Sequence, residues 1–330
     1  MNVERWTLAS ARDRIAALEY ETPLGAGAGL AAIIVDVGDD PADDVGSALT
    51  QLPLVAIALG AGGASWDIAT DDLAPLSSGL EVAPRAAVVA AQVLRGTARE
   101  ERTLTDGLLV ESLAYAALQG GPDHGAWLQV RAQRSDGKVK LPQEDDHGPD
   151  CVIINDDDNQ VAITLNRPHV ANAFNAAMRD QLADALRAAR ADTAHRPILI
   201  RGAGNAFCSG GDLTEFGTVA DPSTAHLLRS STAVAPLLTQ VAGHTTAFID
   251  GACVGAGIEL AAFCHRIEAT PRARFRLPEV SMGLIPGVGG TVSIPRRIGR
   301  QRTLEWLISN RELDTTTALS WGLVDAIVDN

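Results

Sequence analysis

Several motifs that identify common enzyme classes are absent from this sequence. It has no GxxxxGK[ST] phosphate loop, no GxSxG turn around a nucleophilic serine and no HExxH pair for zinc. The two candidates for a dinucleotide fingerprint, GAGAGL at 25–30 and GAGNAF at 202–207, both lack the third glycine. The usual nucleotide-binding, serine-hydrolase and zinc-protease interpretations are therefore disfavoured.

Cysteine is scarce, and the four present stand far apart at Cys151, Cys208, Cys253 and Cys264. Without a CxxC pair they indicate buried small side chains in a reducing compartment. The amino terminus is charged where a signal peptide needs an apolar core. The uncharged run 45–66 contains Pro53 and four glycines, which favours a buried strand and turn over a membrane span. We therefore expect a cytoplasmic protein without a membrane partner.

Basic residues are also too few and too scattered for a nucleic-acid surface. The formal net charge is -14, with 23 acids and 11 bases in residues 1–150 against 18 and 16 in the remainder. No Lys/Arg stripe with interleaved aromatic residues is found. The densest basic cluster is Arg296, Arg297, Arg300 and Arg302, which we interpret as a solvated helix face. Nucleic acid is accordingly not an expected partner.

The chain is long for one compact unit, and its composition is that of an ordinary globular protein with 46% hydrophobic residues. The polar segment 131–150 is the best linker candidate, and it separates an N-terminal α/β region, 1–140, from a core at 151–330. In that core, apolar strand patterns alternate with helical ones, which predicts βαβ units and a parallel sheet.

The N-terminal region has two apolar-faced helical patterns, at 84–96 and 106–119. In segment 52–67 an apolar strand pattern is followed by GAG and later by an aspartate, and segment 196–212 has the same order. An internal duplication with a degenerate first copy is one interpretation, and independent βαβ units that share a strand–glycine turn are the other. The two short matches leave both open.

Three glycine-rich passages in the second half carry the strongest chemical signal: 202–212, 251–260 and 283–291. Glycine lets backbone N–H groups approach a ligand, and a helix start adds a positive dipole end, so such passages suit an anion hole. Glu259 and Glu279 stand beside them. Taken singly, Glu259 is typical of an acid that complements the dipole in the first turn of a helix, and Glu279 is typical of a surface acid. Together beside an anion hole they suit proton transfer near a carbonyl.

The second half resembles the enoyl-CoA hydratase/isomerase, or crotonase, superfamily. Four segments carry the resemblance in order: LNRPHVANAFN (165–175), GAGNAFCSGGDL (202–213), GACVGAGIELAAFCH (251–265) and RLPEVSMGLIPGVGGT (276–291). It covers residues 151–330 nearly end to end. The implied fold is an α/β spiral of ββα units, and the implied partner is an acyl-CoA thioester, with trimers or hexamers usual and a hetero-complex as the alternative.

The resemblance implies roles for eight residues. Gly211 and Ala256 match the two backbone N–H donors of the oxyanion hole, and Glu259 and Glu279 match the two acids that hydratases fill with glutamate. The remaining four are expected along the path of coenzyme A: Arg167, Ala206, Ser209 and Gly210. The presence of both acids favours a hydro-lyase, namely an enoyl-CoA hydratase of the kind used in fatty acid β-oxidation. The resemblance implies no metal or redox cofactor, since both acids act on the substrate directly.

The sequence departs from the family pattern in places. Arg276 stands where a glycine is usual, and the family's C-terminal helices, which cover the acyl pocket, have no counterpart before Asn330. We hypothesise that the helices at 84–96 and 106–119 supply part of that cover. The alternatives are an isomerase that uses one acid, a non-catalytic acyl-CoA-binding or partner subunit, and a ClpP-like peptidase, for which no Ser-His-Asp set can be assembled.

Overall fold

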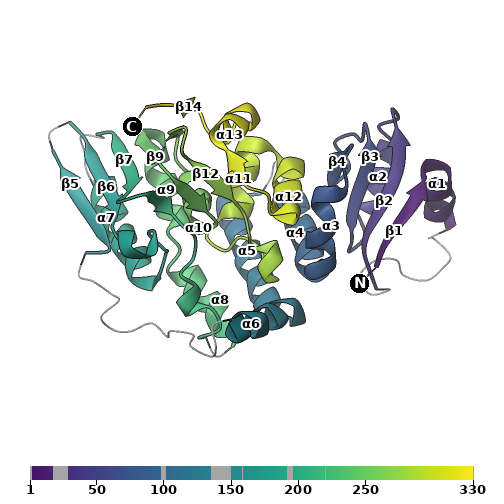
Figure 1. The fold of residues 1–330 in the computed structure, drawn as a ribbon, viewed down its shortest axis with the longest axis horizontal. Helices are drawn as coiled ribbons and strands as arrows, with labels where there is room; N and C mark the ends of the chain where they lie inside the picture. Colours follow the sequence, from purple (N-terminus) through teal and green to yellow (C-terminus); the bar gives the residue numbers. More distant parts are fainter. Residues whose placement is uncertain are drawn as a thin grey trace.

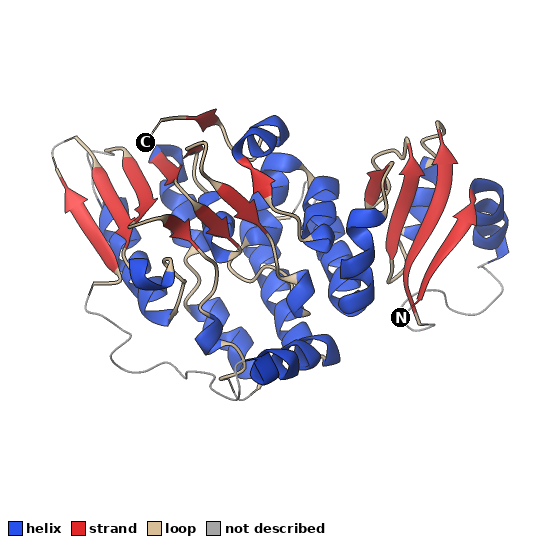
Figure 2. Ribbon diagram, viewed as in Figure 1, coloured by secondary structure: helices blue, strands red, loops and turns tan. Residues whose placement is uncertain are grey.

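The computed structural model describes residues 2–17, 29–97, 102–134, 150–157, 159–191, 196–219 and 221–329. An N-terminal sheet lies at one end of an elongated molecule, a six-stranded sheet at the other, and a layer of helices between them (Figure 1). Figure 2 shows the same arrangement by secondary structure, with helices on both sides of the strands. The fold is thus mixed α/β, as predicted.

The N-terminal sheet is wholly parallel. Its strand β2 (Leu30–Gly38) is apolar almost throughout, as strands covered on both faces are. Ile33 and Val35 join a small core with α1 and α2, whereas Ala32 and Ile34 face the main core. The sheet order is β1 (Asn2–Thr7), β2 (Leu30–Gly38), β3 (Val55–Gly60) and β4 (Ile68–Thr70), with helices α1 (Leu8–Ala17) and α2 (Asp43–Leu49). Since α2 covers 45–49, the strand expected in the uncharged run begins only at Val55.

Four helices connect this sheet to the second half: α3 (Ala74–Val82), α4 (Pro84–Thr97), α5 (Leu104–Gln119) and α6 (Pro122–Arg134). The helices α4 and α5 lie where the sequence predicts helices. Because α6 continues to Arg134, the first residues of the expected linker are helical, and 135–149 lie outside the described residues. Both α4 and α5 pack against helix α11 (Gly290–Ile298), and α3 and α4 pack against α12 (Arg300–Ser309).

The second half contains two sheets built from paired strands. In the six-stranded sheet all neighbours are parallel except β5 and β6: the order is β14 (Ala326–Ile327), β11 (Arg266–Ala269), β9 (Thr245–Ile249), β7 (Ile198–Gly202), β6 (Val161–Leu165) and β5 (Val152–Asp156). The other sheet has the order β13 (Leu313–Asp314), β12 (Arg274–Arg276), β10 (Ala252–Val254) and β8 (Ala206–Cys208), with β12, β10 and β8 parallel.

Three successive strand pairs, β7–β8, β9–β10 and β11–β12, each contribute one strand to each sheet. Helical segments follow each pair, which makes a repeated ββα unit. These are η4 (Leu213–Glu215), α8 (Pro222–Ser231), α9 (Ala235–Val241) and η5 (Ala242–His244) after the first, α10 (Ala256–Ala261) after the second, and η6 (Val280–Met282) and α11 after the third. Outside these units lie η3 (Pro168–Val170), α7 (Ala176–Ala191) and α13 (Thr315–Trp321).

Two sequence predictions about side chains have different outcomes here. All four cysteines are buried, as expected, and none of them forms a disulfide in the part of the chain that the structure describes. The arginine cluster is not uniformly solvated, and that interpretation was wrong for two of its members. Arg297 donates to the carbonyl of Ala262 and pairs with Asp325, and Arg300 pairs with Asp67 of the N-terminal sheet. These arginines join elements, because each reaches an acceptor or a carboxylate on another segment.

No helix among the described residues is long and apolar enough to cross a membrane.

Candidate active site

The carboxyl ends of the parallel strands β8, β10 and β12 meet at one edge of their sheet, where ligands of parallel α/β sheets bind. Each strand is followed within three residues by one predicted site residue: Gly211 after β8, Ala256 after β10 and Glu279 after β12. The strand pairing of the ββα units thus brings together residues that are distant in the chain.

The loops after β8 and β10 lie against each other. Gly210 has φ 102°, and a Cβ on Gly255 would meet the Cα of Gly210 at 3.7 Å. The loop after β8 is fixed by Phe174, whose N–H donates to the Gly210 carbonyl and whose carbonyl accepts from Asp212. Within the described residues, no acceptor takes the N–H of Gly211 or of Ala256, the first residue of α10. Two unpaired amide donors therefore lie at this edge.

Glu259 is buried in α10, and two backbone amides donate to its Oε2: Val288 at 2.7 Å and Gly290 at 2.9 Å. Burial raises the pKa of Glu259 to about 7, while these amides and Arg229 act in the opposite direction by favouring the charged form. Because amide N–H groups can only donate, Glu259 is the carboxylate of this site best suited to carry a negative charge.

Glu279 has the opposite environment. It follows β12 and Pro278, its Oε1 lies where a Cβ on Gly255 would stand (2.5 Å), and its buried Oε2 has no hydrogen-bond partner. Burial raises the pKa of Glu279 well above its usual value, and the charges of Glu259 and Glu111 raise it further. A buried carboxyl group with one oxygen that has no donor among the described residues is best suited to hold its proton. Only glycine at 255, with φ 48°, leaves room for it.

A third buried acid, Glu111 of α5, belongs to the same cluster, and the sequence reasoning missed it. Gly289 donates to its Oε1 at 2.7 Å, and the Thr291 amide and hydroxyl donate to its Oε2 at 2.8 and 2.7 Å. Burial, and then the charge of Glu259, raise the pKa of Glu111 to about 8. The available signal was an acid beyond the first turn of an apolar helix, in line with Gly107 and Tyr115 at a spacing of four residues.

Arg229 of α8 is the cation nearest to this cluster. Its Cζ lies 4.0 Å from the ring centroid of Tyr115, and its guanidinium makes long contacts of 3.4–3.5 Å with Ser112 and Gln119 of α5. Burial lowers the pKa of Arg229, whereas Tyr115 and the nearby glutamates Glu111 and Glu259 raise it. The sequence reasoning did not single out Arg229 or Tyr115, since neither stands in a motif.

The four residues expected along the coenzyme A path lie around the first loop. Arg167 is 3% exposed, and its Nη1 pairs with Asp212 Oδ2 at 2.9 Å. Its guanidinium is thus placed to hold the residue after Gly211, and this conformation does not present it to a phosphate. Ser209 donates to the Val170 carbonyl at 3.3 Å, and Ala206 is buried in β8. Contacts of Ala206, Ser209 and Gly210 with coenzyme A stay predictions.

Arg276 does not narrow the site. It is exposed, and its Nε donates to Asn310 at the end of α12, to the carbonyl at 3.1 Å and to Oδ1 at 2.8 Å. The departure from the family's glycine is therefore accommodated by a contact with α12.

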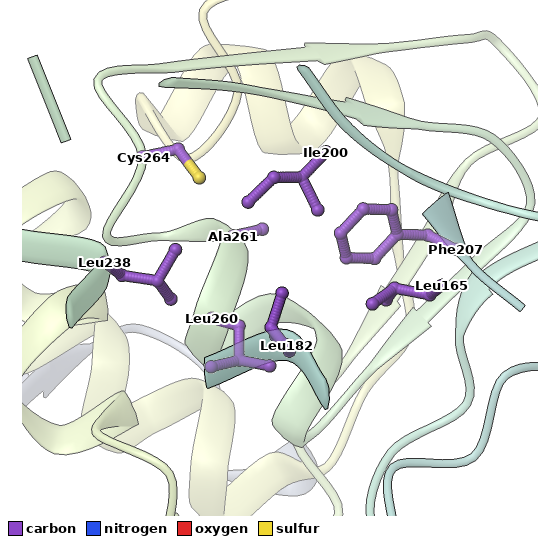
Figure 3. Close-up of a pocket in the computed structure, with 8 residues that line it drawn as sticks. All are labelled: Leu165, Leu182, Ile200, Phe207, Leu238, Leu260, Ala261 and Cys264. Atoms are coloured by element: carbon purple, nitrogen blue, oxygen red, sulfur yellow. The ribbon is translucent and has the colours of Figure 1, made fainter. Parts of the chain in front are cut away.

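A small apolar cavity of about 10 Å³ lies beside α10 (Figure 3). It is lined by Leu165, Leu182, Ile200, Phe207, Leu238, Leu260, Ala261 and Cys264. Its volume is far below that of a ligand pocket, about 300 Å³ or more. It is a packing defect between α7, α9, α10 and the strands, and we do not assign substrate to it.

Comparisons with known proteins find matches to the second half of the chain. The family model described as Enoyl-CoA hydratase/isomerase matches residues 156–330, just over half of the chain. A probable enoyl-CoA hydratase of Mycobacterium bovis is 31% identical over 181 residues, which cover 54% of this chain and 69% of the relative. The 2,3-dehydroadipyl-CoA hydratase of Escherichia coli is 32% identical over 182 residues, covering 53% and 68%.

Solved structures match over the same part of the chain. The enoyl-CoA hydratase of Thermoplasma volcanium superposes with a TM-score of 0.51 at 31% identity, covering 54% of this chain and 72% of that one. A Mycobacterium abscessus protein titled putative enoyl-CoA hydratase/isomerase gives 0.51 at 33% identity, covering 54% and 71%. The chain belongs to the enoyl-CoA hydratase/isomerase family, and its second half has the crotonase fold.

Proposed function

We propose that this protein is an enoyl-CoA hydratase, which adds water reversibly to the double bond of a 2-enoyl-CoA thioester. The observation that carries the proposal is the contrast between Glu259, which accepts hydrogen bonds from two amides, and Glu279, which accepts none from a neighbouring residue. Hydration needs a base for water and an acid for the α carbon, so two acids in different states suit it.

The thioester carbonyl would accept hydrogen bonds from the N–H groups of Gly211 and Ala256. Attack at the β carbon places negative charge on that oxygen, and a fixed donor lowers the energy of such a charge by about 3–4 kcal/mol. The position of Ala256 at the start of α10 adds the positive end of a short helix, and Gly211 is held by the Phe174 and Arg167–Asp212 contacts.

The acids then divide the chemistry. Glu259 takes a proton from water as the oxygen bonds to the β carbon, and Glu279 gives its proton to the α carbon as the enolate collapses. In the reverse direction Glu279 removes the α proton and Glu259 protonates the departing hydroxyl. The reaction needs no bound metal or redox group, since both protons move between these carboxyl groups and the substrate.

The test is to incubate the purified protein with crotonyl-CoA and with longer and cyclic 2-enoyl-CoAs and to follow the conjugated thioester absorbance. We expect turnover of at least one thioester, and a fall in kcat of roughly 10²- to 10⁴-fold in Glu259→Gln and in Glu279→Gln. The exposed Glu81→Gln, which removes an acid without a described partner, is the matched control.

Two results would contradict the proposal. If no thioester is turned over although CoA esters bind, the protein is an acyl-CoA-binding or partner subunit. If only Glu279→Gln, or only Glu259→Gln, abolishes activity and the product is a shifted double bond, the protein is an isomerase that uses one acid.

A further inference from the structure

The segment 287–291, which leads into helix α11, is held between two carboxylates that come from different halves of the chain. The four consecutive amides of residues 288–291 donate alternately, Val288 and Gly290 to Glu259 and Gly289 and Thr291 to Glu111. Successive amides of this segment therefore have acceptors on two different elements, α10 and α5. A shift of either carboxylate displaces the amides that position the other.

The backbone geometry of this segment depends on both contacts. Gly289 has φ 107°, which only glycine adopts without strain, and it forms the N-cap of α11. Because glycine has no side chain that could cap the helix, Glu111 supplies the acceptors for the amides of Gly289 and of Thr291 in the first turn of α11. The Thr291 hydroxyl completes the set as a third donor to Glu111.

Helix α5 is shaped for this contact along one stripe. Gly107, Glu111 and Tyr115 are four residues apart and face the same segment. A Cβ on Gly107 would lie 2.8 Å from Val292, and a Cβ on Gly287 would lie 2.6 Å from the Tyr115 ring. The small residue at 107 and the glycine at 287 thus let the helix approach closely enough for Glu111 to reach two amides.

We propose that Glu111 is a positioning residue of the active site: it fixes the 288–291 segment, whose amides hold Glu259. The inference rests on the proposed function and extends it to the N-terminal half of the chain. Both carboxylate oxygens of Glu111 accept hydrogen bonds from this segment, so Glu111 acts through the segment and does not itself meet the substrate.

The test compares Glu111→Gln with the exposed control Glu81→Gln on the helix α3. A glutamine keeps the shape but has one acceptor oxygen and no charge, so it cannot serve both Gly289 and Thr291. We expect kcat to fall about 10- to 100-fold, as misplacement of a catalytic group does. KM should change less than about threefold, because the oxyanion donors are untouched.

Two further readouts separate positioning from a merely structural role. The alkaline limb of the pH–rate profile should move to lower pH in Glu111→Gln, since the charge of Glu111 raises the pKa of Glu279. Amide hydrogen exchange should accelerate at Gly289 and Thr291 more than at Val288 and Gly290. Glu81→Gln should change neither.

A folded Glu111→Gln variant with unchanged kcat and pH profile would overturn the proposal, whatever its exchange rates. If that variant does not fold, Thr291→Val removes only the hydroxyl donor to Glu111, and we expect a smaller kcat loss and the same direction of pH shift; no change in either would also overturn it. An inactive wild-type protein would instead remove the proposed function, so the two failures are distinguishable.

Discussion

Three glutamates, Glu111, Glu259 and Glu279, are buried together, and their hydrogen-bond partners differ. Glu259 and Glu111 accept from backbone amides, whereas Glu279 has a buried oxygen without a partner. Burial is the largest cause of the raised pKa at all three. Since like charges in a dry site repel, the cluster retains protons at neutral pH, and the unpartnered Glu279 is the member that holds one most firmly.

This cluster makes stability depend on pH. The folded state keeps protons that the unfolded state releases above the ordinary glutamate pKa of 4.5, so this contribution is full below that pH and is lost as pH rises through about 7 and 8. We expect the free energy of unfolding in urea to fall between pH 6.5 and 8, a window above the titration of His124, whose lowered pKa acts oppositely.

The fall should be smaller in Glu279→Gln, which removes one of the three ionisable groups. A wild-type stability that rises over this window, or an identical slope in the variant, would contradict the assignment of a buried protonated cluster.

At this scale the sequence predicted some residues and missed others for physical reasons. Glu259 and Glu279 stand in ordered glycine-rich motifs, and the structure places them beside the predicted loops. Glu111 lies 148 residues before Glu259 and 168 before Glu279 in the chain, and the packing of α5 on α11 brings it to them. The local turn directs the guanidinium of Arg167 to Asp212, a contact that the sequence did not reveal, and its contact with coenzyme A stays a prediction.

At the scale of elements, the site depends on pairs of strands and on one close helix contact. The strands β7 and β9 were predictable, because each has an apolar pattern that ends at or near a glycine. The strands β11 and β12 were not, since both are short, contain arginine and have no glycine directly after them. The end of α10 at Ala261 was not, since the apolar pattern runs on through Phe263. There the chain turns instead, with Phe263 N–H donating to the Leu260 carbonyl.

The α5–α11 contact gives a test of packing. In Gly107→Ala the new methyl group would lie 2.8 Å from Val292 Cγ2, so one of the helices must shift. We expect the free energy of unfolding to fall by about 1–3 kcal/mol. The control is Gly125→Ala in α6, where nothing lies within 4 Å and a gain of about 0.5–1 kcal/mol is expected. A neutral Gly107→Ala alongside a stabilising Gly125→Ala would show that α5 does not approach α11 so closely.

At the scale of the whole molecule, the N-terminal half packs against the catalytic half. The main core runs from Ile34 and Ile57 of the first sheet through α4 to α11, α12 and the strands of the second half. The sequence suggested that the helices at 84–96 and 106–119 supply part of the cover of the acyl pocket. Both helices pack on α11, and their role as that cover stays a prediction. A duplication of the fold in residues 1–140 stays a prediction.

Residues 151–330 produced alone should therefore aggregate or lack activity. Without the N-terminal half, the apolar faces of α11 and α12 would be exposed to water, and the amides of Gly289 and Thr291 would have no Glu111 carboxylate to accept their hydrogen bonds. Size-exclusion chromatography and the thioester assay measure both properties. A monodisperse, fully active fragment would show that the N-terminal half is dispensable, and it would also contradict the role of Glu111.

The measurement that tests the central claim most directly is product analysis of a turned-over 2-enoyl-CoA in ¹⁸O-labelled water by mass spectrometry. If Glu259 activates water and Glu279 protonates the α carbon, the product is a 3-hydroxyacyl-CoA that carries the label, and Glu259→Gln and Glu279→Gln form it far more slowly. A 3-enoyl-CoA without label, or labelled product formed equally well by both variants, would contradict the account.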